Sequence, residues 1–188
     1  MSVVEDPRFP HLGGNPPGGD RATFCPALWK WLVEKHEIKR VLDVGCGEGH
    51  ALAEFKKLGC ETLGLDGLSA NVEKRPKPAV VHDLTTGPFS ASGYDLIWCC
   101  EVVEHVEEGK CGHLLDLLSQ GRVLAMTHAT PGQSGHHHVN CQPQEYWINL
   151  MSERGMRLSA EDTEEGRRRC PGDNHFGRHG LIFHKEAK

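Results

Sequence analysis

The segment 41–49 (Val-Leu-Asp-Val-Gly-Cys-Gly-Glu-Gly) constrains the fold more strongly than any other part of the chain. It starts as a short aliphatic strand, passes through glycines at alternate positions and leads into a helix with apolar residues at Leu52, Phe55 and Leu58. Glycines at such a turn adopt backbone conformations that other residues avoid, and they let a ligand lie against the main chain. The spacing Gly-x-Gly-x-Gly differs from the Gly-x-Gly-x-x-Gly of dinucleotide sites. The segment therefore predicts a strand-turn-helix unit at a ligand site and disfavours NAD.

The same strand signal recurs along the chain, with helical patterns in between. Aliphatic runs bounded by glycine, proline or polar residues predict strands at 39–45, 61–66, 79–82, 94–100, 122–127, 156–160 and 180–184. Apolar residues three and four positions apart predict helices at 26–36, after the glycine turn up to Gly59, from Leu114 to near Gly121, and at 143–154. This alternation is typical of a three-layer α/β fold whose ligands bind beyond the carboxyl ends of the strands. The charged stretch 161–169 separates the last two strands, and we expect its Arg167-Arg168-Arg169 run to be a solvated loop, with binding of a phosphorylated or nucleic-acid acceptor as the alternative.

The length of 188 residues favours one domain. The glycines and prolines of residues 1–20 predict an irregular N-terminal arm, which leaves residues 21–188 as the folded domain. No apolar run reaches the ~20 residues of a membrane-spanning helix, and the first residues lack the pattern of a signal peptide. We therefore expect a cytoplasmic protein without membrane contact, either a monomer or a homodimer.

Charge and cysteine usage exclude further classes. Lys and Arg number 21 against 26 Asp and Glu, a net charge of −5, which offers no global attraction to a nucleic-acid backbone. The eight cysteines form no Cys-x-x-Cys pair, so we expect buried free thiols. Neither Cys111-x-His113 nor the run His136-His137-His138 has the paired spacing of a structural zinc site.

With these motifs established, the chain resembles the class I S-adenosylmethionine-dependent methyltransferases over about residues 21–184. The resemblance rests on the 41–49 motif, on acidic residues after the second and third strands, and on the 94–106 segment. It implies a Rossmann-like fold with a mostly parallel seven-stranded sheet and one antiparallel strand near the C-terminus. It also implies S-adenosylmethionine as the cofactor and S-adenosylhomocysteine as its product.

The resemblance further implies which residues hold the cofactor. They are Asp43, Gly45, Cys46, Gly47, Gly49, Asp66, Gly67, Asp83, Leu84, Cys100 and Glu101. Asp66 is expected to accept both ribose hydroxyls, since one carboxylate accepts from two donors. Asp83 is expected to accept from the adenine amino group, with Leu84 against the ring. Arg21 or Thr23 is a candidate for the methionine carboxylate.

A Glu-x-x-Glu-His pattern follows the fourth strand, at Glu101, Glu104 and His105. In the small-RNA 2′-O-methyltransferases such a pattern joins a later histidine in binding magnesium beside the ribose hydroxyls, and His137 is the candidate for that histidine here. The same pattern also occurs in relatives that bind no metal. Magnesium is therefore an alternative that we do not favour from the sequence.

Our main functional hypothesis is O-methylation of a small molecule or a saccharide, with His137 or His105 as the base that removes the acceptor proton. Gln142 and Tyr146 are candidates for the acceptor side, and Trp147 fits the apolar core. The first alternative is a magnesium-dependent RNA ribose 2′-O-methyltransferase. The second is a noncatalytic, cofactor-binding partner subunit.

Two other acceptor classes are disfavoured. Methylation of cytosine C5 needs a Pro-Cys nucleophile, and this chain has only the reversed order, at Cys25-Pro26 and Cys170-Pro171. Methylation of amino groups usually needs Asn-Pro-Pro-aromatic after the fourth strand, where this chain has Cys-Cys-Glu-Val at 99–102.

Overall fold

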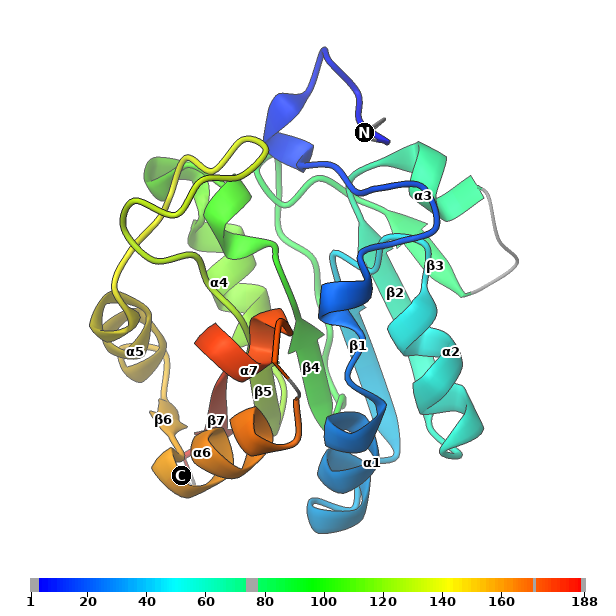
Figure 1. Ribbon diagram of the computed structural model, residues 1–188, viewed down its shortest axis with the longest axis vertical. Coiled ribbons are helices and arrows are strands. Elements are labelled where there is room, and N and C mark those ends of the chain that lie inside the picture. Colours follow the sequence, from blue (N-terminus) through cyan, green and yellow to red (C-terminus); the bar gives the residue numbers. More distant parts are fainter. Residues whose placement is uncertain (1–3, 74–77, 171, 187–188) are drawn as a thin grey trace.

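The computed structural model describes residues 4–73, 78–170 and 172–186, and within them seven strands form a single sheet (Figure 1). The strand order is β3-β2-β1-β4-β5-β7-β6. The strands are β1 (Arg40–Val44), β2 (Glu61–Asp66), β3 (Ala79–Val81), β4 (Leu96–Cys99), β5 (Val123–Met126), β6 (Met156–Leu158) and β7 (Leu181–Lys185). Neighbours pair in parallel, except that β7 runs antiparallel to both β5 and β6. The predicted Rossmann-like sheet, with one antiparallel strand near the C-terminus, is confirmed.

Helices cover both faces of this sheet, which makes the three layers (Figure 1). On one face lie α1 (Pro26–Lys35), α2 (His50–Lys57), α6 (Ala160–Arg168) and α7 (His175–His179). On the other face lie α4 (Gly112–Leu118) and α5 (Gln144–Ser152), and the short α3 (Ser69–Glu73) follows β2. No helix among the described residues is long and apolar enough to cross a membrane.

Strand β4 shows how the alternation of side chains builds two cores. Leu96 and Trp98 face the α1 side, while Ile97 and Cys99 face the α4 side. The α1 side is rich in aromatic rings: Trp98 stacks on Phe176 with ring centroids 5.3 Å apart and meets Trp29 edge-on at 5.7 Å. Because both faces of β4 are fully covered, its sequence reads as an unbroken apolar run.

The predicted loop within 161–169 was wrong, because these residues form most of α6. Ser159 begins the helix by accepting a hydrogen bond from the Asp162 N–H. The buried residues of α6 are Asp162, Thr163 and Gly166, so the sequence carries no apolar periodicity. The arginines expected in that loop are bound locally, since Arg168 and Arg169 both pair with Glu165.

The N-terminal arm, described here from residue 4 to residue 20, lies across the edge of the sheet where the parallel strands end (Figure 1). Its described part is irregular apart from a 3-10 turn at Pro10–Leu12 and a bridge between Val4 and Asn15. A second 3-10 turn, Arg21–Thr23, then connects it to α1. The arm therefore covers the edge at which ligands of this fold class bind.

Candidate active site

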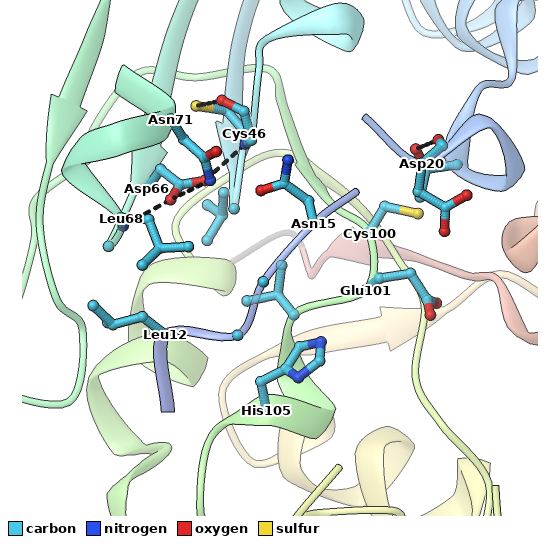
Figure 2. A pocket seen from close by; sticks show the side chains of 18 of the residues that line it. Leu12, Asn15, Asp20, Cys46, Asp66, Leu68, Asn71, Cys100, Glu101 and His105 are labelled. Carbon is cyan, nitrogen blue, oxygen red and sulfur yellow. Dashed lines mark hydrogen bonds between the residues drawn. The ribbon is translucent and has the colours of Figure 1, made fainter. Parts of the chain in front are cut away.

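A cavity of about 630 Å³ opens at the carboxyl ends of β1, β2 and β4. This is the point where the strand order reverses, because β2 and β4 lie on opposite sides of β1. Figure 2 shows Asp66, Leu68 and Asn71 on one side of the cavity and Cys100 and Glu101 on the other. The arm provides a further wall, so the cavity is large enough and deep enough for a nucleoside-sized ligand.

The glycine turn after β1 shapes the floor of the cavity. Gly45 has φ of +73°, and a Cβ atom there would collide with the side chain of Val102. The N–H groups of Gly45 and Cys46 both donate to the carbonyl oxygen of Leu65, at 2.7 and 3.1 Å. Gly49 has φ of +76° and directly precedes α2, which begins at His50. Glycine is therefore required at 45 and 49 by the path of the backbone.

Asp66 fastens the glycine turn to the end of β2. Its Oδ2 accepts from the Gly47 N–H at 2.7 Å, and its Oδ1 accepts from the Leu68 N–H at 2.8 Å and the Asn71 side chain at 3.2 Å (Figure 2). A carboxylate has about four acceptor sites, so it also suits the ribose hydroxyls expected there.

Asp83 lies at the far end of the cavity and is held by the arm. His11 Nε2 is 2.9 Å from Asp83 Oδ2, and Thr85 donates to Oδ1 from both its N–H and its hydroxyl. Burial raises the pKa of Asp83, but these hydrogen bonds lower it by more, so the net shift is downward. Asp83 is thus ionised and acts as a hydrogen-bond acceptor at this end of the cavity.

The structure brings the predicted cofactor residues together around this cavity, with one exception. Those in its wall are Asp43, Gly45, Cys46, Gly47, Asp66, Gly67, Asp83, Leu84, Cys100 and Glu101. Gly49 lies outside the wall. Arg21 and Thr23 also line the cavity, whereas Gln142, Tyr146 and Trp147 do not. Trp147 is fully buried in the core, as expected.

Glu101 adopts a left-handed backbone conformation with φ of +57°. Two hydrogen bonds join Glu101 to Thr127: the threonine hydroxyl accepts from the Glu101 N–H and donates to the Glu101 Oε1, both at 2.8 Å. His175 lies between two acidic groups, with Nδ1 3.4 Å from Glu101 Oε2 and Nε2 3.1 Å from Asp20 Oδ2. Sequence reasoning missed His175, since it comes from the short helix α7 and belongs to no recognisable motif.

Glu104 lies behind this wall and is completely buried. Neither of its carboxylate oxygens has a hydrogen-bond partner among the residues that the structure describes. Burial and the nearby charge of Glu101 raise the pKa of Glu104 well above its usual value. A buried, unpaired carboxylate is costly, which marks Glu104 as a group that lacks a positively charged partner.

Two imidazoles face Glu104. Ligand atoms of Glu104, His105 and His138 all lie within 4.8 Å of one another, and the two rings have centroids 5.2 Å apart. Burial, followed by the proximity of His138, lowers the pKa of His105 to about 4, so this imidazole is neutral at pH 7. A carboxylate and neutral imidazoles are ligands that divalent transition metals and zinc accept. The donor set therefore fits a divalent cation.

The histidine in this cluster is His138 and not the predicted His137. The loop is fixed by the Glu104 carbonyl oxygen, which accepts from the N–H groups of Val139 and Asn140, both at 3.0 Å. His137 adopts φ of +48° and does not line the cavity, whereas His138 does. Glu101, also predicted as a metal ligand, lies outside the 4.8 Å cluster and binds Thr127 instead.

Together, a parallel sheet with this strand order, a glycine turn after β1 and a carboxylate at the end of β2 define a class I S-adenosylmethionine-dependent methyltransferase. A family model described as "Methyltransferase domain" matches residues 19–163, and the chain belongs to that family. The resemblance noted in the sequence is thereby confirmed.

Several known proteins are similar to this chain. A small RNA 2′-O-methyltransferase of Mus musculus is 31% identical over 124 residues, which cover 50% of this chain and 31% of that protein. A ubiquinone biosynthesis O-methyltransferase of Bordetella avium (strain 197N) is 32% identical over 98 residues, 44% of this chain and 40% of that protein. The structure of a magnesium protoporphyrin IX methyltransferase from Synechocystis PCC 6803 with bound S-adenosylmethionine has a TM-score of 0.61 at 16% identity, covering 85% of this chain and 77% of that one. The chain thus spans less than half the length of these two curated relatives, and the solved structure bears on the fold alone.

Proposed function

We propose that this protein transfers the methyl group of S-adenosylmethionine to a hydroxyl oxygen of its acceptor, and that a divalent cation at Glu104, His105 and His138 assists the transfer. The observation that carries the proposal is the buried Glu104 carboxylate, which has no hydrogen-bond partner among the described residues and faces two imidazoles. The sequence alone favoured a metal-free reaction with a histidine base. The burial of Glu104 is what changes that preference.

The cofactor residues have separable tasks. The glycine turn and Asp66 fit the ribose, and Asp83 with Leu84 fits the adenine. S-adenosylmethionine supplies a methyl group on a positively charged sulfur, and its leaving group is a neutral thioether. Catalysis then depends mainly on in-line placement of the acceptor oxygen, and the cavity walls provide that placement.

The metal residues act on the acceptor side of the same cavity, because His105 and His138 line it. A divalent cation held there would supply Lewis-acid chemistry, which would orient the acceptor oxygen and ease the loss of its proton to solvent water. His105, with a pKa of about 4, is a weak base at neutral pH and suits the role of ligand better than that of base. Glu104 contributes the negative charge that holds the cation.

The acceptor that we favour is a small molecule or a saccharide. Among the described residues that line the cavity, Arg21 is the one arginine or lysine, so a polyanionic acceptor gains little attraction there. An RNA ribose is the second candidate, and the observation that favours it is the similarity to the small RNA 2′-O-methyltransferase of Mus musculus.

The test compares three proteins: the wild type, Glu104→Gln and the matched control Glu107→Gln, which alters an exposed carboxylate on the same segment. For each we measure the Tm with and without the cation, the affinity for S-adenosylhomocysteine, and the methyl-transfer activity. We expect Mn²⁺ or Co²⁺, which accept imidazole ligands more readily than Mg²⁺ does, to raise the Tm of wild type and Glu107→Gln but not of Glu104→Gln, while all three bind S-adenosylhomocysteine. In chelator, Glu104→Gln should melt no lower than wild type, since burial already favours the uncharged form of Glu104 when no cation is bound.

Activity is followed as S-adenosylhomocysteine release with a panel of catechols, saccharides, nucleosides and short RNA. Activity that is lost in chelator and restored by the cation supports the proposal, and the panel identifies the acceptor. Metal stabilisation that persists in Glu104→Gln, or turnover that chelator leaves unchanged, rules out the metal site.

A further inference from the structure

A second cluster of potential metal ligands lies at the opposite edge of the sheet. It consists of His36, which directly follows α1, Asp162 in the first turn of α6, and His184 on β7. His184 pairs with Val123, the first residue of β5, so it lies at the edge where the parallel strands begin. The cavity lies at the edge where those strands end, which makes this cluster separate from the active site.

The two imidazoles converge on the same carboxylate oxygen. Oδ2 of Asp162 is 2.6 Å from His184 Nε2 and 3.3 Å from His36 Nε2, and the two rings lie with centroids 5.0 Å apart. One ligand atom from each residue lies within 4.8 Å of the other two. Three elements that are distant in sequence therefore present two nitrogens and one oxygen to a common point.

The Nε2 atom of His36 is buried at that point. Its side chain is 10% exposed, and its buried Nε2 forms no hydrogen bond with any residue that the structure describes. A buried imidazole nitrogen that lies beside a carboxylate oxygen without a hydrogen bond is placed as a metal ligand would be.

Neighbouring side chains hold the Asp162 carboxylate and the backbone of His36 in place. Lys35 Nζ donates to the other oxygen, Oδ1 of Asp162, at 2.6 Å, which leaves Oδ2 facing the imidazoles. Ligating carboxylates usually have such an outer hydrogen bond, and it fixes their orientation. The backbone of His36 is held as well, because Arg122 donates to its carbonyl oxygen at 2.6 Å. The side chain of His184 is 38% exposed, which gives an ion a path from solvent.

We propose that His36, Asp162 and His184 form a zinc site that ties α1, α6 and β7 together. Two imidazole nitrogens and one carboxylate oxygen suit Zn²⁺, and the exposed side next to His184 leaves room for water as a further ligand. The site is independent of methyl transfer. Its expected role is to hold the helix before β1 against the C-terminal strand and so to stabilise the fold.

The test uses full-length protein freed of metal with chelator and titrated with Zn²⁺ by calorimetry. The background is Glu104→Gln, which removes the one carboxylate from the ligand set near the cofactor cavity and so weakens binding there. On it we compare His184→Asn and the control His113→Asn, which alters an exposed histidine on α4. A substitution in the outer shell of a metal already costs roughly 10–100-fold in affinity, so loss of His184 should weaken Zn²⁺ binding more than about 100-fold.

The His113→Asn control should bind Zn²⁺ with the same affinity as the Glu104→Gln background. Zn²⁺ should raise the Tm of these two proteins but not that of the protein that also carries His184→Asn. His36→Gln provides a second variant with the same expected loss. Binding of S-adenosylhomocysteine, at the other edge of the sheet, reports that each variant is folded.

If the three groups form only an internal ion-pair network, the Glu104→Gln background takes up no Zn²⁺, or His184→Asn binds it equally well, and either result overturns the proposal. Failure of the Glu104 site alone leaves this result unchanged, because every protein compared carries Glu104→Gln.

Discussion

At the scale of single residues, Asp66 organises the cofactor end of the cavity. Its two oxygens accept from Gly47 in the glycine turn and from Leu68 and Asn71 beyond β2. Hydrogen bonds to a charged group contribute roughly 1.5–3 kcal/mol each. Loss of this carboxylate removes the tie that positions the turn and, under the proposed function, also the acceptor for the ribose hydroxyls.

We expect Asp66→Ala to weaken S-adenosylhomocysteine binding by about 100-fold or more, since two charged hydrogen bonds are lost. Isothermal titration of the purified protein measures this directly. Asp116→Ala, an exposed aspartate on α4, should bind as wild type does. An unchanged affinity in Asp66→Ala would show that the cofactor is held elsewhere.

The sequence predicted most of the residues that line the cavity, but not which histidine lies beside Glu104 and His105. Asp66, Asp83 and the glycines were predictable because they follow strands, and parallel strands end at a common edge. His137 and His138 are adjacent, and the choice between them depends on loop dihedral angles that no periodicity encodes. His137 has φ of +48°, and it is His138 that lies beside His105.

At the scale of elements, the central strand β1 starts from a side-chain cap. Asp95 Oδ2 accepts from the N–H groups of Lys39 and Arg40, at 2.8 and 3.0 Å, where β1 begins. Burial raises the pKa of Asp95, but these two backbone hydrogen bonds lower it by more, and the net shift is downward. The cap is therefore strongest when the carboxylate is ionised.

The sign of the pH dependence follows from that shift. A lowered folded-state pKa means that the unfolded chain binds more protons in acid, so the contribution of Asp95 is present above about pH 4 and is lost as the pH falls through the folded-state pKa. We expect Asp95→Asn to lower the free energy of unfolding by about 1 kcal/mol at pH 7 and to flatten its decline below pH 4. Urea denaturation at a series of pH values measures both. The fully exposed Asp173→Asn should change neither, and parallel curves for Asp95→Asn and wild type would contradict the assignment.

Strands were more predictable than the short helices. The aliphatic runs of β1, β4 and β5 are bounded by polar residues or glycine, so their positions were clear from the sequence. Helix α6 buries Asp162 and Thr163 rather than apolar residues, and α7 contains a glycine and two histidines in five residues. Tertiary contacts, which a local pattern does not contain, hold these two helices in place.

At the scale of the whole molecule, the C-terminal segment completes the aromatic core and the site together. Phe176 of α7 is fully buried, and its ring stacks on Trp98 of the central strand β4. The neighbouring residue, His175, is the one that lies between Asp20 and Glu101. Packing of α7 against the sheet therefore determines the position of a cavity residue.

We expect Phe176→Ala to lower the free energy of unfolding by about 3–5 kcal/mol, because it leaves a void between α7 and the sheet. Phe176→Leu keeps most of the volume and should cost less than about 1.5 kcal/mol. Chemical denaturation of the two variants gives both values. A cost for Phe176→Ala below about 1 kcal/mol would mean that α7 contributes little to the core.

The arm is fastened to the rest of the molecule at points spread along its length. Glu5 pairs with His136 at 2.9 Å, His11 with Asp83 at 2.9 Å, and the Gly18 N–H donates to Glu48 at 2.7 Å. These contacts join the arm to the histidine loop, to Asp83 and to the segment that follows the glycine turn. Because the arm forms part of the cavity wall, we expect variants that weaken these contacts to release S-adenosylhomocysteine faster than wild type does.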